Sequence, residues 1–299
     1  MSFINIFIQN PCKVYVKNAQ LVLEGKEKMD WPLEDISAVL VESRECLISS
    51  YALSELSKHK IVVYFCDEKH MPTSYLLPFN DHYQPLKVQK AQLNIEKPLQ
   101  KQLWQIIIKQ KLLNQATVLQ DINKTVSEEL ISLSQKVKSN DADNLEAVGA
   151  LKYFKALFGN KFTRKNDSAI NACLNYGYSI IRGAISRAVA VHGLNPAFGI
   201  FHKGSLNAFN LSDDIIEPFR PVVDSFVVQH INPNILELSP AIKHKLFNLL
   251  NVDVFIGKEK QPVKVAIDKV VQSFCETIEN KKIKLVLPQL TELAVHLYE

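Results

Sequence analysis

The residues with the clearest chemical potential lie in the segment HKGSLNAFNLSDDIIEPFRPVVD at 202–224. His202 lies in a glycine-containing loop, and a predicted helix with an acidic first turn follows it. Asp214 and Glu217 are three residues apart on that helix, so they share one face. Carboxylate oxygens together with one imidazole suit Mg²⁺ or Mn²⁺ better than a structural zinc ion. The segment therefore indicates a divalent-metal site.

A second acidic helix lies upstream, in NDADNLEAVGALKYFKALFG at 140–159. Glu146 has the small neighbours Ala147, Gly149 and Ala150, which we expect to let another backbone or a bulky substrate approach its carboxylate. A glutamate on one helix, a histidine in a loop and a glutamate on a second helix, in a basic protein, suggest metal-assisted phosphodiester chemistry.

Each of these residues also has an ordinary structural explanation. Asp141 or Asp143 can cap the helix of Glu146, and acids in a first turn complement the helix dipole. A histidine in an apolar loop is more often held in place by structural hydrogen bonds than by a metal. Glu217 can pair with an arginine three residues further on, although ligand carboxylates usually have such partners too.

Four segments resemble the family called CRISPR-associated protein one, the integrase and endonuclease of spacer acquisition. They occur in the order and with the spacing of that family, and the EPFRP form is most similar to the branch that accompanies single-protein effector nucleases. The segments are LEAVGALKYF (145–154), LNYGYSIIRGAI (174–185), GLNPAFGIFHKG (193–204) and LSDDIIEPFRPVVD (211–224).

The resemblance implies that Glu146, His202 and Glu217 are the catalytic metal ligands. We expect Asp214 and Arg220 to support these ligands or to serve as alternatives to them. The cofactor implied is Mg²⁺ or Mn²⁺, and the glutamate at 217 stands where many relatives carry aspartate.

The activity implied is that of a metal-dependent DNA integrase and endonuclease of CRISPR adaptation. Such an enzyme joins 3′-hydroxyl ends of new spacer DNA to the repeat array by phosphoryl transfer. Transesterification needs no ATP, and the chain lacks GxxxxGK[ST] and GxGxxG. The partners implied are double-stranded DNA (spacer precursor and CRISPR repeat), a second copy in a homodimer, and CRISPR-associated protein two. The effector nuclease is a further candidate partner, and no membrane partner is expected.

Local clustering must supply any DNA-binding surface, because 35 Lys and Arg against 31 Asp and Glu leave a net charge of only +4. A basic cluster is by default a solvated face. Its closeness in sequence to the suspected phosphodiester site favours a role in binding DNA. The candidate phosphate contacts are Lys152, Lys155, Lys161, Arg164, Lys165 and Lys203.

Two other functions compete with the integrase. A non-catalytic DNA-binding scaffold protein would use the same basic surface and show salt dependence without needing a metal. A helical carboxylate oxygenase with iron would carry paired Glu-x-x-His helices, which do not occur here.

The periodicity of apolar residues predicts an α+β protein with a small β-rich domain followed by a large all-α catalytic domain. Short runs rich in Val and Ile between residues 2 and 43 read as strands, with a hairpin at 17–20, a helix at 48–59 and a buried strand at 61–67. The resemblance implies that this part is β-sandwich-like. Three prolines in 72–85 indicate a linker, which gives a β-rich domain at 1–75, a linker at 76–85 and a helical domain at 86–299.

Helical periodicity begins at residue 86. Pro98 should start a new helix, Ser212 should be an N-cap, and Pro218 should kink its helix. The predicted helices span 86–120 (whole or broken), 122–138, 143–158, 168–191, 212–230, 240–250 and 262–280.

Composition sets further bounds. An apolar content of 47% is ample for a core, and five cysteines without a CxxC pair favour reduced thiols in a cytoplasmic protein. No apolar run reaches the roughly 20 residues of a membrane helix, and the first residues do not have the form of a signal peptide. The apolar runs of the β-rich domain predict a dimerisation surface there, although the same residues can equally form its own core.

Overall fold

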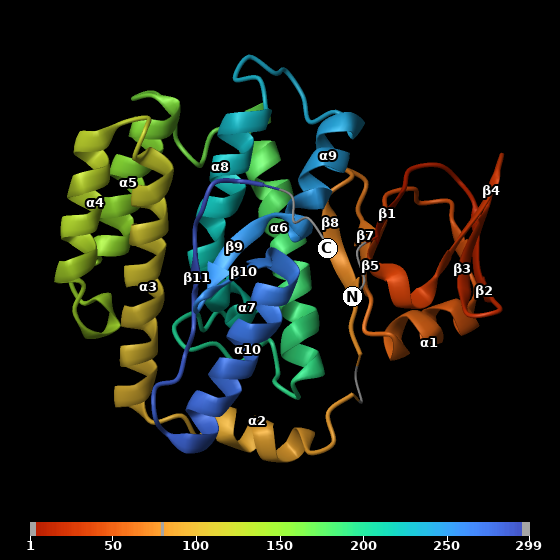
Figure 1. Cartoon of the computed structure of the whole chain (residues 1–299), viewed down its shortest axis with the longest axis horizontal. Coiled ribbons are helices and arrows are strands. Elements are labelled where there is room, and N and C mark those ends of the chain that lie inside the picture. Colours follow the sequence, from red (N-terminus) through yellow and green to blue (C-terminus); the bar gives the residue numbers. More distant parts are fainter. Residues whose placement is uncertain (1–3, 79–80, 295–299) are drawn as a thin grey trace. The chain divides into compact units, whose positions relative to one another are not determined.

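The computed structural model describes residues 4–78 and 81–294. The chain divides into two compact units, Met1–Tyr83 and Gln84–Glu299. The first is rich in strands and the second is mostly helical (Figure 1). The predicted fold class is therefore confirmed.

The N-terminal unit contains two sheets of four strands each. The first has the order β1-β5-β7-β8, with β8 antiparallel to β7 and the other pairs parallel. The second has the order β4-β3-β2-β6. The first sheet comprises β1 (Ile4–Ile8), β5 (Ile36–Val41), β7 (Val62–Cys66) and β8 (Pro72–Leu76), and the second comprises β4 (Lys28–Pro32), β3 (Gln20–Glu24), β2 (Lys13–Lys17) and β6 (Leu47–Ile48).

Local signals of the N-terminal sequence correspond to these elements. Lys17 pairs with Gln20, and Asn18 and Ala19 between them have φ of 53° and 58°, as a two-residue hairpin turn requires. Helix α1 (Ser50–Lys58) begins after Ser49, whose side chain accepts a hydrogen bond from the backbone N–H of Ala52. The proline-rich segment is not a linker from its start, because its first five residues form strand β8.

The apolar residues of the N-terminal unit form its own core. Ile6, Val14, Leu21 and Val63 belong to one buried cluster, together with residues of α1. The apolar runs therefore give no separate support to a dimerisation surface. The large apolar side chains left exposed on this unit include Leu47 and Tyr51.

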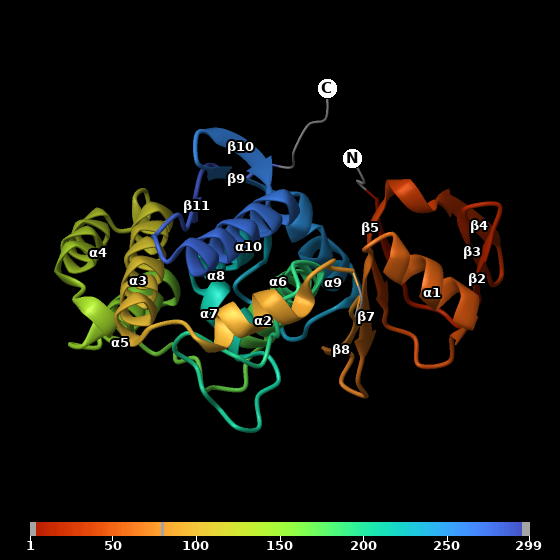
Figure 2. The same ribbon diagram turned by 90° about the horizontal axis from the view of Figure 1, so that it is seen from below.

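The C-terminal unit is built around long helices (Figure 2). Pro98 lies in the first turn of α3, so the predicted break between two helices is confirmed. The helices are α2 (Pro85–Leu93), α3 (Lys97–Leu119), α4 (Lys124–Lys136), α5 (Leu145–Phe158), α6 (Ala169–Val191), α7 (Asn210–Ile215), α8 (Arg220–His230), α9 (Pro240–Phe247) and α10 (Val263–Asn280), with 3₁₀ turns η1 (Leu33–Asp35, in the first unit), η2 (Ser139–Asp141), η3 (Glu217–Phe219) and η4 (Asn248–Asn251).

The helix predicted over 212–230 is divided. Pro218 and Pro221 lack the N–H groups that a continuous helix uses, and the chain forms α7, the 3₁₀ turn η3 and then α8. The prediction that Ser212 caps the helix is wrong, because α7 begins at Asn210. Ser212 is buried, and its hydroxyl oxygen lies 2.9 Å from that of Ser186 on α6.

A small sheet in the C-terminal unit was not predicted. It has the order β10-β9-β11 and comprises β9 (Asp253–Ile256), β10 (Glu259–Pro262) and β11 (Pro288–Gln289). The Asn114 amide of α3 donates to the carbonyl of Pro288 at 2.9 Å and accepts from the backbone N–H of Leu290 at 3.2 Å. The late chain segment is thus fixed against α3 (Figure 1). Over the residues the structure describes, no helix is both long and apolar enough to cross a bilayer.

Candidate active site

The ammonium group of Lys111 on α3 lies between two of the predicted site residues. It contacts Oε1 of Glu146 and lies 2.5 Å from Oε2 of Glu217. Lys111 is 6% exposed and Glu217 is also 6% exposed. Two carboxylates from distant parts of the sequence thus share one buried cationic group.

The start of α5 fixes the position of Glu146. The two carboxylate oxygens of Asp141 accept from the backbone N–H groups of Leu145 at 2.9 Å and Glu146 at 3.0 Å. Of the two predicted caps, Asp141 and Asp143, it is Asp141 that binds the first N–H groups of the helix, while Asn144 occupies the N-cap position itself. A side-chain carbon added at Gly149 would lie 2.3 Å from Leu112 of α3, so the glycine permits packing against α3 rather than the approach of a substrate.

The turn η3 presents Glu217 to Lys111. The amide of Asn114 donates to the carbonyl of Pro218 at 2.7 Å, which attaches η3 to α3. Arg220 donates from Nε to Oε1 of Glu217 at 2.9 Å, as the three-residue spacing predicts. Burial alone would raise the pKa of Glu217, but the charges of Arg220 and Lys111 outweigh it and lower that pKa to about 2. The carboxylate is therefore ionised at neutral pH.

Asp214 on α7 holds the histidine loop. Its buried carboxylate lies 2.7 Å from Nδ1 of His202 and accepts from the backbone N–H groups of Ile200, Phe201 and His202. The hydrogen bond to Asp214 raises the pKa of His202. A side chain at Gly199 would meet the carbonyl of His202 at 2.3 Å, so only glycine fits this bend. Asp214 is thus a partner of His202.

The histidine loop also rests on α3. Trp104 stacks on Phe201 with ring centroids 4.2 Å apart, and it meets the ring of His202 edge-on at 5.7 Å. Lys111 lies about two turns after Trp104 on α3, and Asn114 follows about one turn later, so one helix contacts the segments that carry all three predicted ligands.

The structure brings Glu146 and Glu217 together, and His202 is close enough for the charge of Glu217 to contribute to its raised pKa. Across residues 4–78 and 81–294, no three His, Cys, Asp or Glu side chains are arranged as a metal site. The ammonium of Lys111 takes the position between the two glutamates. Coordination by all three residues therefore stays a prediction.

The candidate phosphate contacts differ in their surroundings. Lys152 pairs with Glu129 on the surface, and Arg164 is half-buried with hydrogen bonds to Asn171 and Asn175. The remaining four are exposed, namely Lys155, Lys161, Lys165 and Lys203. Their contact with DNA stays a prediction.

Sequence reasoning missed Lys111. The available signal was its position in LWQIIIKQKLLNQA, where Ile107, Ile108 and Leu112 mark the buried face of the helix. A lysine on such a face requires acidic partners, because an unpaired buried charge is costly.

Two solved structures have the same fold as this chain. A casposase bound to its integration product matches with a TM-score of 0.78 and 20% identity, covering 95% of this chain and 92% of that one. A Cas6-RT-Cas1–Cas2 complex matches with a TM-score of 0.72 and 18% identity, covering 97% of this chain and 36% of that one. This chain therefore shares the fold of both structures, a strand-rich unit followed by a helical unit.

The family model described as CRISPR associated protein Cas1 matches residues 6–252. A CRISPR-associated endonuclease Cas1 from Neisseria meningitidis serogroup C (strain 8013) is 41% identical over 304 residues, covering 100% of both chains. The chain therefore belongs to the Cas1 family, as its motifs indicated.

Proposed function

We propose that this protein is a metal-dependent DNA integrase and endonuclease of CRISPR adaptation. It joins 3′-hydroxyl ends of new spacer DNA to the repeat array by phosphoryl transfer. Family membership and the endonuclease name of the Neisseria relative support this activity. The observation that carries it is the convergence of Glu146 and Glu217 on one buried cationic group.

The residues present fit a divalent cation. Two carboxylates already share a positive charge, and their hard oxygens match Mg²⁺ or Mn²⁺. Asp214 engages Nδ1 of His202, which leaves Nε2 as the ligand nitrogen, the arrangement common for metal-bound histidines. Glu146, His202 and Glu217 would hold the ion, which supplies Lewis acidity toward a 3′-hydroxyl or water and the attacked phosphate.

The protein groups prepare this chemistry. Asp141 sets the backbone position of Glu146, Asp214 orients the imidazole of His202, and Arg220 keeps Glu217 ionised. Lys111 pairs with both glutamates and must withdraw its ammonium for their oxygens to bind another cation. The same lysine then remains beside the site as a positive charge for the reacting phosphate.

The partners proposed are double-stranded DNA, Cas2 and a second copy of the chain. The related Cas6-RT-Cas1–Cas2 complex supports Cas2, and the casposase structure supports DNA. A homodimer would supply two equivalent sites, and inserting a duplex needs two strand joinings. Sedimentation of the full chain at micromolar concentration tests the dimer.

A strand-joining assay tests the function. The protein is incubated with a duplex that ends in 3′-hydroxyls and a plasmid that carries the repeat, with and without Cas2, in Mn²⁺. Joined product is expected in Mn²⁺. No product is expected when EDTA replaces the metal or when the DNA ends lack the 3′-hydroxyl. Salt-dependent DNA binding without any joined product, with Cas2 and either metal present, would contradict the proposal and favour the alternative of a non-catalytic DNA-binding scaffold protein.

A further inference from the structure

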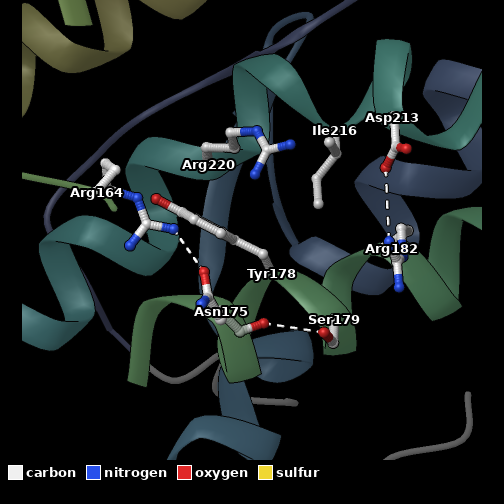
Figure 3. A pocket seen from close by; sticks show the side chains of 8 residues that line it. All are labelled: Arg164, Asn175, Tyr178, Ser179, Arg182, Asp213, Ile216 and Arg220. Atoms are coloured by element: carbon white, nitrogen blue, oxygen red, sulfur yellow. Dashed lines mark hydrogen bonds and ion pairs between the residues drawn. The ribbon is translucent and has the colours of Figure 1, made fainter. Parts of the chain in front are cut away.

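A cavity of about 240 Å³ lies beside the candidate active site, because Arg220, which pairs with Glu217, is part of its lining (Figure 3). Arginines from three segments line it: Arg164 from the loop after α5, Arg182 from α6 and Arg220 from α8. It is smaller than the roughly 300–1,000 Å³ typical of sites for drug-sized ligands. Its size and lining suit a small anionic group.

The position of Arg164 is fixed by neighbouring amides. Its guanidinium donates to the side-chain oxygen of Asn171 and, at 2.6 Å, to that of Asn175. Asn171 in turn donates to the carbonyls of Thr163 at 2.9 Å and Asn166 at 2.8 Å, which closes the loop around the arginine. Arg164 is therefore held by hydrogen bonds to neutral amides, and its charge also acts on the buried carboxylate of Asp224.

Tyr178 forms the wall on which two of the arginines rest. The guanidinium carbons of Arg164 and Arg220 lie 5.2 Å and 4.7 Å from the centroid of its ring. The phenol hydroxyl donates to the buried carboxylate of Asp224. Cation–π contacts of this kind orient guanidinium groups without neutralising them.

Among the residues that line the cavity, positive groups outnumber negative ones, and the carboxylates of Glu217 and Asp224 act on the arginines from outside the lining. Asp213 is the one carboxylate in the lining, 3.9 Å from Arg182, against three guanidinium groups. Arg220 also pairs with Oε1 of Glu217, and Lys111 contacts Oε2 of the same carboxylate. The side chains of Arg182 and Arg220 are 31% and 28% exposed, so an anion from solution can reach them. Arginine forks match phosphate oxygens in geometry and charge.

We propose that the arginine cavity formed by Arg164, Arg182 and Arg220 binds one phosphate of the DNA strand that reacts at Glu146 and Glu217. Arg220 touches both Glu217 and the cavity, so the bound phosphate neighbours the reacting end of the same strand. The cavity fixes the register of the strand, because a phosphate held there sets where the 3′-hydroxyl lies. This inference rests on the proposed function for the identity of the ligand as DNA.

The test measures binding of a fluorescein-labelled oligothymidylate with a 3′-hydroxyl in EDTA, by fluorescence anisotropy. A single neutral methylphosphonate linkage is moved along the strand from its 3′ end. Neutralising one linkage should weaken binding by roughly 10- to 150-fold, the fold-change that corresponds to the loss of one charge-assisted hydrogen bond, while the other linkages have small effects. Arg164→Gln combined with Arg182→Gln should remove this position-specific effect.

Arg187→Gln is the matched control. Arg187 lies on the same helix as Arg182, pairs with Asp268 and does not line the cavity, so this variant should keep the wild-type profile. If the double variant does not fold by circular dichroism, Arg182→Gln alone carries the test and should reduce the position-specific effect severalfold. A flat profile in the wild type, or the same profile in wild type and cavity variants, would overturn the proposal. Because binding is measured without metal, this test does not depend on strand-joining activity. A failure of the proposed function and a failure of the arginine cavity can therefore be told apart.

Discussion

Replacing Lys111 with methionine probes the centre of the site. The change keeps most of the side-chain volume and removes the charge that Glu146 and Glu217 share. Removing one partner of a buried ion pair costs about 3–5 kcal/mol, since the other charge stays buried. Arg220 still pairs with Glu217, so the loss should lie near the lower end, about 3 kcal/mol.

Thermal unfolding in EDTA measures this loss. At about 2–4 °C per kcal/mol for a unit of this size, the midpoint should fall by roughly 10 °C. Lys152→Met is the matched control, because Lys152 forms an exposed pair with Glu129 and should change stability by less than about 1 kcal/mol. Adding Glu146→Gln to Lys111→Met should recover part of the loss, since it removes the carboxylate whose cationic partner was replaced.

Mn²⁺ gives the same variant a second readout. Without the ammonium as competitor, the glutamates should bind Mn²⁺ more tightly, and a ligand at 100 times its Kd stabilises by about 2.7 kcal/mol. Mn²⁺ should therefore raise the unfolding midpoint of Lys111→Met more than that of the wild type. An unchanged midpoint in EDTA would refute the buried pair, and equal shifts with Mn²⁺ would refute competition between lysine and metal.

Three further predictions concern the ligands, the cap and the basic surface. Glu217→Gln should abolish strand joining in Mn²⁺ and leave DNA binding nearly intact, so joining at the wild-type rate would refute its role. Asp141→Ala should cost about 0.5–2 kcal/mol in thermal unfolding and lower the joining rate, with Asp143→Ala as a control that should affect neither. Lys161→Ala with Arg164→Ala should weaken DNA binding and flatten its dependence on salt, and an unchanged salt slope would argue against phosphate contacts there.

The fold could be predicted wherever periodicity was sustained. Long helices such as α3 and α6 and the hairpin of β2 and β3 follow from apolar spacing and turn geometry. The short strands β6, β9 and β11 were missed, since two to four residues carry no periodic signal and pairing partners come from elsewhere in the chain. The Ser212 cap failed because the backbone had already turned helical at Asn210.

The acidic residues of the candidate site could be predicted from the sequence, but the buried lysine between them could not. Motifs picked out Glu146 and Glu217, and the three-residue spacing anticipated the pair between Glu217 and Arg220. The partnership of Lys111 with both glutamates depends on the packing of α3 against α5 and η3, which no local pattern encodes. The cavity likewise joins a loop arginine to arginines of two helices.

Crystals soaked in Mn²⁺ would test the central claim most directly. Anomalous scattering locates the ion independently of any assumption about its ligands. The account predicts one peak at roughly 2.0–2.3 Å from a carboxylate oxygen of Glu146, one of Glu217 and Nε2 of His202, with the Lys111 ammonium displaced. A peak that omits either glutamate, or no peak while Lys111 stays between them, would contradict it.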